Sequence, residues 1–340
     1  MIWMNLGRWT SKSVRSMKSF GSSSLSLDYL MTDQDDALDL RHGASIRWDH
    51  PDLAVDSDTS RRARYRQLQS RFREEVLGIG VGLDSREIRR PNMLPRAAVS
   101  ERPHLNFLSP AIGEYARARA SVVGAEHGTL EEDRLYRNML SSMPMCFNLF
   151  GQLRVYPQSA ARLLSDALEL DIAAVSKIDV EWTPKGEHPL GDRTAFDAFV
   201  EYITSDGKRG FLGVETKYTE PFSHREYDKP SYRRWSGPKH GFVDGAAHRL
   251  MQRKTNQLWR NLLLVIATRH EQDYAHGHVV VIAPADDRGA SKALDGVRAQ
   301  MVEPKKSVRG IDLESLMARA AEYDELSAWA RRFSERYLAV

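Results

Sequence analysis

The chain has 340 residues, of which 41% are hydrophobic and 28% charged, and its net charge is +3 (49 Lys and Arg against 46 Asp and Glu). These values support a folded core, exclude a fibrous or wholly disordered chain, and exclude a body that is a polycation throughout. No apolar run approaches the roughly 20 residues of a membrane-spanning helix. The single cysteine, Cys146, excludes an intramolecular disulfide framework and a cysteine-rich zinc module, so we expect a soluble, cytoplasmic protein.

Three regions are predicted along the chain. Residues 1–59 are expected to form a disordered basic and polar extension, because residues 1–27 carry four cations and no acid and no apolar period follows. A transit peptide, or a start of translation at Met31, is the alternative for the first residues. Residues 60–125 are predicted to be helical and loop-rich, and residues 126–340 to form the main α/β domain with a C-terminal helix.

The elements are predicted from apolar periodicity. Helices are expected, in chain order, at 60–77, 110–122, 130–142, 158–170, 246–268 and 311–337. Strands are expected at 175–182, 194–203, 209–218 and 278–283. A helix, three strands, a second helix and a fourth strand, in that order, are typical of an α/β domain with a mixed sheet.

Charged residues interrupt the apolar strand at 209–218 near its end. Because side chains on a strand alternate between faces, Glu215 and Lys217 are expected on one face and Thr216 on the other. Charges beside an apolar strand are costly unless they are paired or bound to a metal. Glu215 and Lys217 are therefore a candidate site.

The turn between the second and third strands decides whether Asp197 joins them. A two-residue turn at Asp206-Gly207 pairs Ala198 with Glu215 and sends Asp197 to the opposite face. A three-residue loop, Ser205-Asp206-Gly207, instead pairs Asp197 directly with Glu215. Glycine suits the left-handed last position of that longer loop, so we predict the three-residue register.

Two carboxylates and a lysine suit the hydrolysis of a phosphate ester. Carboxylate oxygens bind Mg²⁺, and the ion lowers the pKa of a bound water and neutralises charge that develops on a phosphate. A lysine can orient that water or help to deprotonate it, and it can stabilise the charged transition state. The alternative is a salt bridge between neighbouring strands, which contributes little.

The same residues resemble a known family. The Asp197…Glu215-x-Lys217 arrangement is similar to that of the PD-(D/E)xK nuclease superfamily. A restriction-endonuclease-like family within it is resembled more closely, over roughly residues 104–283, in four segments: Arg137-Asn-Met-Leu-Ser-Ser, Cys146-Phe-Asn-Leu-Phe-Gly151, Gly191-Asp-Arg-Thr-Ala-Phe-Asp197 and Glu215-Thr-Lys-Tyr-Thr-Glu220. One departure is that Phe196, not proline, precedes Asp197.

The resemblance implies a restriction-endonuclease-like fold, with a helix, three antiparallel strands, a helix and a strand, extended here by an N-terminal helical region. It also implies a Mg²⁺-dependent endonuclease, with Mn²⁺ as a substitute ion. Asp197 and Glu215 are then metal ligands, and Lys217 positions the attacking water. The family often has a further acidic ligand upstream; Glu181 is the first candidate and Glu132 the second, and an ordinary solvated carboxylate is the alternative for either.

Residues of the predicted helix at 246–268 extend this resemblance. Arg253, Gln257 and Arg260 are spaced at i, i+4 and i+7 and are therefore expected on one face. A Gln or Arg there resembles the superfamily's helix residue that contacts phosphate or the active lysine. We assign Gln257 to the catalytic set and Arg253 and Arg260 to nucleic-acid binding; a plain polar helix face is the alternative.

The segment from Lys217 to Arg260 has ten Lys and Arg against four Asp and Glu, with aromatic residues between them. Basic side chains neutralise phosphates and aromatic rings stack on bases, so we predict nucleic-acid contacts here. The residues assigned to these contacts are Arg233, Arg234, Trp235 and Lys239. The alternative is a long loop whose aromatic residues anchor it to the core.

The predicted partner is nucleic acid, specifically double-stranded DNA, with a homodimer as the arrangement that cuts both strands. Two other functions stay open at this point. One is an inactive nuclease-fold protein that binds nucleic acid or another partner without turnover. The other is a metal-binding structural protein whose acidic cluster locks two strands together.

Overall fold

A computed structural model describes residues 55–125, 130–223 and 225–339. Most of the extension predicted for residues 1–59 therefore lies outside the described residues. No described helix has the length and apolar character needed to cross a bilayer.

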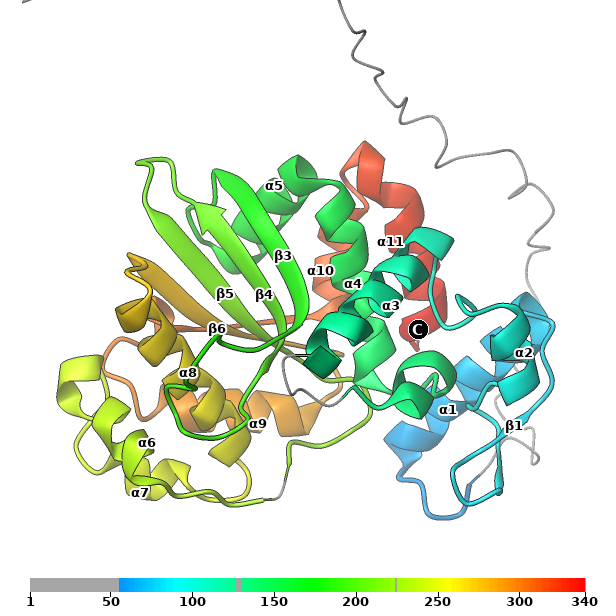
Figure 1. Ribbon diagram of the computed structural model, residues 1–340, viewed down its shortest axis with the longest axis horizontal. Helices are drawn as coiled ribbons and strands as arrows, with labels where there is room; N and C mark the ends of the chain where they lie inside the picture. Colours follow the sequence, from blue (N-terminus) through cyan, green and yellow to red (C-terminus); the bar gives the residue numbers. More distant parts are fainter. Residues whose placement is uncertain (1–54, 126–129, 224, 340) are drawn as a thin grey trace, which may run out of the picture. The chain divides into compact units, whose positions relative to one another are not determined.

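The core of the described chain is a five-stranded mixed sheet in the order β3-β4-β5-β6-β7 (Figure 1). β3 to β5 are antiparallel neighbours, and β6 and β7 continue the sheet in parallel with β5. The strands are β3 (Ala174–Trp182), β4 (Phe196–Ile203), β5 (Arg209–Thr216), β6 (His276–Ala283) and β7 (Val308–Asp312). The four predicted strands and the mixed sheet are confirmed; β7 was not predicted, because its five residues include Arg309, Gly310 and Asp312.

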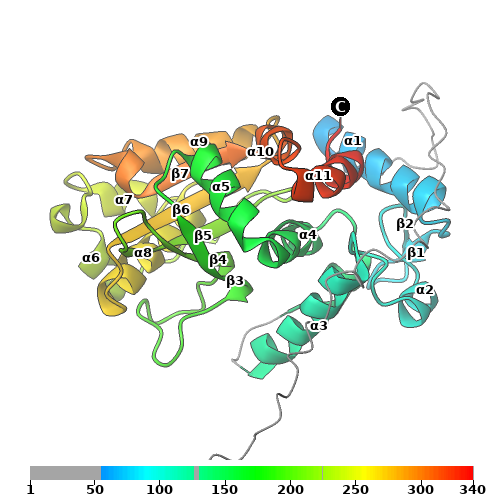
Figure 2. The same ribbon diagram turned by 90° about the horizontal axis from the view of Figure 1, so that it is seen from above.

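Helices cover both faces of the sheet (Figures 1 and 2). One face packs against α4 (Ser142–Val155), α5 (Pro157–Leu168), α10 (Leu313–Ala320) and α11 (Asp324–Tyr337). The other packs against α6 (Pro230–Trp235), α7 (Ala246–Leu250), α8 (Asn256–Glu271) and α9 (Arg288–Arg298).

The alternation of side chains along the strands explains the two cores. On β5, Leu212 and Val214 join the α4 side while Phe211 joins the α8 side. β6 does the same with Val280 and Val281. A strand buried on both faces needs apolar residues at nearly every position, as the run in β6 predicted.

The N-terminal region packs against α4, α11 and the edge strand β3. It contains α1 (Ser60–Arg71), a π-helical turn (Phe72–Val76), a small hairpin of β1 (Gly82–Leu83) and β2 (Arg89–Arg90), α2 (Arg96–Glu101) and α3 (Pro110–Ala125). On α1, the Gln69 side chain donates hydrogen bonds to the Arg336 carbonyl oxygen (2.5 Å) and to the Tyr218 hydroxyl (2.8 Å). Because Tyr218 directly follows Lys217, α1 supports the end of the strand that carries the candidate site.

Three predicted helices are broken or displaced. The helix at 246–268 is two helices, α7 and α8, because Asn256 Nδ2 donates to the Met251 carbonyl oxygen (2.8 Å) and Thr255 Oγ1 to that of Leu250 (2.9 Å). Side chains thus take the carbonyls that a continuous helix would use. The helix at 311–337 is likewise two helices, α10 and α11, each of which buries its own apolar face. Most of 130–142 is not α-helical: a π-helical turn at Asp133–Arg137 leads through extended Asn138 to α4.

Candidate active site

The turn between β4 and β5 has the predicted three-residue form. The Thr204 amide donates to the Lys208 carbonyl oxygen (2.9 Å), which leaves Ser205–Gly207 as the loop, and Gly207 has a φ of 79°. Ala198 consequently pairs with Val214, and Asp197 lies opposite Glu215. The predicted register is confirmed.

Regular pairing between β4 and β5 begins only at Ala198, and the Asp197 carboxylate lies where the ladder stops. Its Oδ2 accepts hydrogen bonds from the Thr216 amide (2.7 Å) and the Thr216 hydroxyl (2.8 Å). Within residues 55–125, 130–223 and 225–339, the other oxygen, Oδ1, accepts no hydrogen bond. Asp197 is therefore held through one oxygen and has the other available for a ligand.

The Glu215 carboxylate is almost completely buried and is surrounded by donors. Oε1 contacts Lys217 Nζ (2.7 Å) and Gln257 Nε2 (2.6 Å), and Oε2 accepts from Asn261 Nδ2 (2.5 Å). Gln257 and Asn261 lie one turn apart on α8, which packs against β5 and β6. The structure places Gln257 at the site, as predicted. Asn261 was not predicted, although its i+4 spacing from Gln257 places it on the same face of the helix.

Lys217 is the buried cation of the site. Its ammonium also lies 3.4 Å from Gln257 Oε1 and 4.4 Å from the centre of the Phe222 ring, a cation–π contact. Burial lowers the pKa of Lys217, but the negative charges of Glu215 and Asp197 outweigh burial and the net pKa lies above its usual value. The neighbouring carboxylates therefore favour the charged form of Lys217 in this arrangement, with its ammonium 2.7 Å from Glu215 Oε1.

Glu181 places a third carboxylate next to those of Asp197 and Glu215. We call the carboxylates of Glu181, Asp197 and Glu215 the acidic row. Val180 pairs with Ala198 and Trp182 with Phe196, so Glu181 lies opposite Asp197 on the next strand. Burial, and then the charge of Asp197, raises the pKa of Glu181 to about 8. Burial, and then the charge of Glu215, raises the pKa of Asp197 to about 7. The second acidic candidate, Glu132, is exposed and does not contribute to either shift.

The donor set fits a hard divalent cation in kind. Carboxylate oxygens are the preferred ligands of Mg²⁺. The pKa values of Glu181 and Asp197 are raised first by burial and then by a neighbouring carboxylate, and a bound cation would favour the charged form of both. In the present arrangement of the described residues, no three His, Cys, Asp or Glu side chains are close enough to hold an ion. Both oxygens of Glu215 already have protein donors, so an ion bound to Glu215 would replace one of these contacts.

Arg260 and Arg253 do not share a face. On α8, Arg260 forms a salt bridge with Asp192 (3.1 Å) and donates to Thr194 Oγ1 (2.6 Å), so a buried carboxylate already matches its charge. Arg253 lies in the turn before α8, where its exposed side chain is 3.6 Å from Glu226. The predicted common face of Arg253 with Gln257 and Arg260 is wrong, because the helix begins only at Asn256.

The aromatic residues of the basic segment anchor it to the core. Trp235 is 2% exposed and packs between His240 (5.1 Å between ring centroids) and His270 (5.5 Å). The prediction that Trp235 stacks on a base is therefore contradicted by its burial. Arg233 and Arg234 are exposed; Arg233 forms a salt bridge with Asp228 (2.7 Å) and Arg234 lies 4.9 Å from the Trp235 ring.

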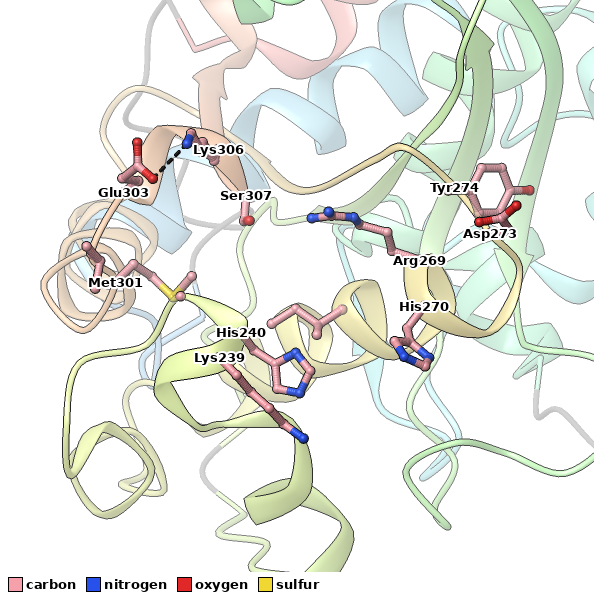
Figure 3. A pocket seen from close by; sticks show the side chains of 13 residues that line it. Lys239, His240, Arg269, His270, Asp273, Tyr274, Met301, Glu303, Lys306 and Ser307 are labelled. Atoms are coloured by element: carbon pink, nitrogen blue, oxygen red, sulfur yellow. Dashed lines mark hydrogen bonds and ion pairs between the residues drawn. The ribbon is translucent and has the colours of Figure 1, made fainter.

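Lys239 lies away from the acidic row, in a hollow of about 650 Å³ (Figure 3). His240, Arg269 and His270 also line this hollow. Arg269 and His270 are in the last turn of α8 whereas Gln257 is in the first, so about 18 Å of helix separates them. Lys239 thus lies well apart from Lys217 and the acidic row.

A comparison with protein-family models identifies the class to which this fold and site belong. The model described as the PD-(D/E)XK nuclease superfamily matches residues 56–339. The chain therefore belongs to the PD-(D/E)XK nuclease superfamily, as predicted. The match is wider than residues 104–283, which carried the resemblance, because it includes α1 and the helices after β6. A search of the curated proteins and a search of the solved structures found no match.

Proposed function

We propose that this protein is a Mg²⁺-dependent endonuclease that hydrolyses phosphodiester bonds of double-stranded DNA in restriction or defence. The observation that carries the proposal is the row formed by Glu181, Asp197 and Glu215 across three strands, with Lys217 at its end. A buried and two partly buried carboxylates beside a buried ammonium are costly for the fold, and such arrangements are concentrated at functional sites.

Asp197, Glu215 and Glu181 would hold the ion, with Mn²⁺ as a substitute for Mg²⁺. When bound, the ion supplies a water of lowered pKa and neutralises charge on the phosphate. Lys217 would donate hydrogen bonds to the attacking water and to the phosphate oxygens, because its ammonium lies 2.7 Å from the Glu215 carboxylate that would hold the ion. Gln257 contacts both Lys217 and Glu215 and holds the two in register.

Exposed cations are proposed to bind the DNA backbone. Arg233, Arg234, Lys239 and Arg253 have exposed side chains and belong to the basic segment between β5 and α8. Their contribution is electrostatic, so it should weaken with salt. A homodimer would place one active site on each strand of the duplex.

The proposal is tested by plasmid nicking. Wild-type protein is expected to convert supercoiled plasmid to nicked or linear DNA with Mg²⁺ and not with EDTA, and Glu215→Gln is expected to abolish the reaction. Glu201→Gln is the matched control, since Glu201 lies on β4 of the same sheet but pairs with Arg209 (3.0 Å) far from the row. Equal cleavage by Glu215→Gln and wild type would contradict the proposal.

If wild-type protein binds DNA but does not nick it, the alternative function would be supported: a nuclease-fold protein that binds nucleic acid without cleaving it. The specific observation in its favour is that both oxygens of Glu215 accept protein donors. Binding of that kind should need no divalent ion and should survive Lys217→Met.

A further inference from the structure

Glu181 has an unusual backbone for a strand residue. Its φ is 53°, in the left-handed region, although it lies within β3. A non-glycine residue in this region is strained and persists only where surrounding contacts hold it. The strained backbone therefore belongs to a residue whose side chain is one of the three carboxylates of the acidic row.

Helix α3 supplies those contacts. β3 is an edge strand, so its outer backbone groups have no neighbouring strand. The Tyr115 hydroxyl accepts a hydrogen bond from the Val180 amide (3.0 Å). Arg119, one turn further along α3, donates from Nε to the Val180 carbonyl oxygen (2.9 Å) and from Nη2 to the Glu181 carbonyl oxygen (2.9 Å).

The two bonds of Arg119 are selective for the left-handed conformation. In a regular strand, consecutive carbonyls point to opposite sides, so one guanidinium group cannot reach both. The positive φ of Glu181 turns its carbonyl to the same side as that of Val180, and the two donors of the planar fork then bind them together. Arg119 therefore stabilises the left-handed backbone and not the extended one.

We infer that Arg119 is a positioning residue that holds the Glu181 carboxylate in the acidic row as a ligand of the divalent cation. The inference rests on the proposed function in so far as Glu181 is a metal ligand. It adds that α3, which lies outside the row itself, sets the affinity of the site for its ion. Removing a group that hydrogen-bonds to a metal ligand and orients it commonly lowers metal affinity by roughly 10- to 100-fold. We expect a loss of metal affinity in this range when Arg119 is replaced.

The test uses full-length protein and Mn²⁺ as the probe, with the dissociation constant read from the signal of free Mn²⁺ by electron paramagnetic resonance. Arg119→Met keeps the aliphatic stem and removes both donors, and we expect it to weaken Mn²⁺ binding by about 10- to 100-fold. Arg119→Lys is expected to recover part of the affinity. Arg117→Met is the matched control, because Arg117 is exposed on the same helix.

A double-mutant cycle separates positioning from general loss of structure. In a Glu181→Gln background, Arg119→Met should change Mn²⁺ affinity little, because the ligand on which it acts is already gone. Equal loss in both backgrounds would overturn the inference.

A crystal structure of Arg119→Met decides the matter even without metal binding. The inference expects a negative φ at Glu181 and a displaced carboxylate, and an unchanged φ would overturn it. If wild-type protein binds no Mn²⁺ and cleaves no DNA, the proposed function fails, while the backbone at Glu181 still tests the role of Arg119.

Discussion

Asp197→Asn is expected to abolish cleavage and, at about pH 8, to make the protein more stable than wild type. The amide keeps an oxygen that can accept the two hydrogen bonds from Thr216, so the fold is retained. It removes one charge from the row, and the loss of a metal ligand costs several kcal/mol of transition-state stabilisation, or about 10³-fold in rate.

The stability gain should depend on pH in a defined direction. The pKa of Asp197 is about 7 in the folded protein, above its ordinary value of 3.8, because burial and then Glu215 disfavour the charged form. The unfolded state therefore ionises first as pH rises, and wild type loses stability between about pH 4 and pH 7. Asp197→Asn avoids this loss, so its gain should be on the order of 1–4 kcal/mol at pH 8, several-fold smaller near pH 4.5, and absent well below the ordinary pKa of 3.8.

Urea unfolding at the two pH values, without divalent ion, measures the gain. Asp206→Asn is a suitable control, because Asp206 is an exposed carboxylate in the β4–β5 turn and its pKa is lowered by Lys208. A loss of stability for Asp197→Asn at the higher pH would show that the carboxylates do not repel one another in the folded protein.

Lys217→Met is the second change with a large expected effect, a reduction of the cleavage rate by about 10²–10³-fold. The methionine fills the space of the lysine stem but brings no charge and no donor to the phosphate. Glu215 retains Gln257 and Asn261 as donors, so the protein should still fold.

Single-turnover cleavage of a plasmid at saturating Mg²⁺ measures this effect, with circular dichroism as the check on folding. Lys208→Met is the matched control: Lys208 is an exposed lysine that pairs with Asp206 (2.6 Å) at the opposite end of the same hairpin. Undiminished cleavage by a folded Lys217→Met protein would remove Lys217 from the mechanism.

The parts of the structure that the sequence predicts well are those set by local patterns. Apolar runs predicted four of the five strands, and the Ser205-Asp206-Gly207 loop predicted the pairing of β4 with β5. A single turn type decides the face of every residue on a hairpin, so that loop also predicted that Asp197 and Glu215 lie opposite each other.

The parts that were missed depend on contacts between distant segments. Asn261 and Arg119 contact the site from helices 46 and 62 residues away in sequence, through side-chain bonds that no periodicity reveals. The break before α8 has a related cause, since Asn256 bonds to Tyr227 and Met251 and ends the helical path. Because of that break, Arg253 lies outside α8 and does not share a helix face with Gln257.

Trp235 illustrates a different failure. Its place among arginines suggested a surface ring, but spacing within a loop does not show which side chains turn inward. The structure buries Trp235 and exposes Arg233 and Arg234 beside it. Composition predicted that the segment is basic, and only packing could show which of its residues are free to bind a phosphate.

The gathering of Asp197, Glu215 and Lys217 into a site for a divalent ion is tested most directly by crystals grown with Mn²⁺. An anomalous difference map should show a peak beside the carboxylates of Asp197, Glu215 and Glu181, the residues that would hold the ion, with Lys217 next to it. A map from fully loaded crystals without a peak at this place, with Glu215 still bound by Gln257 and Asn261, would contradict the account.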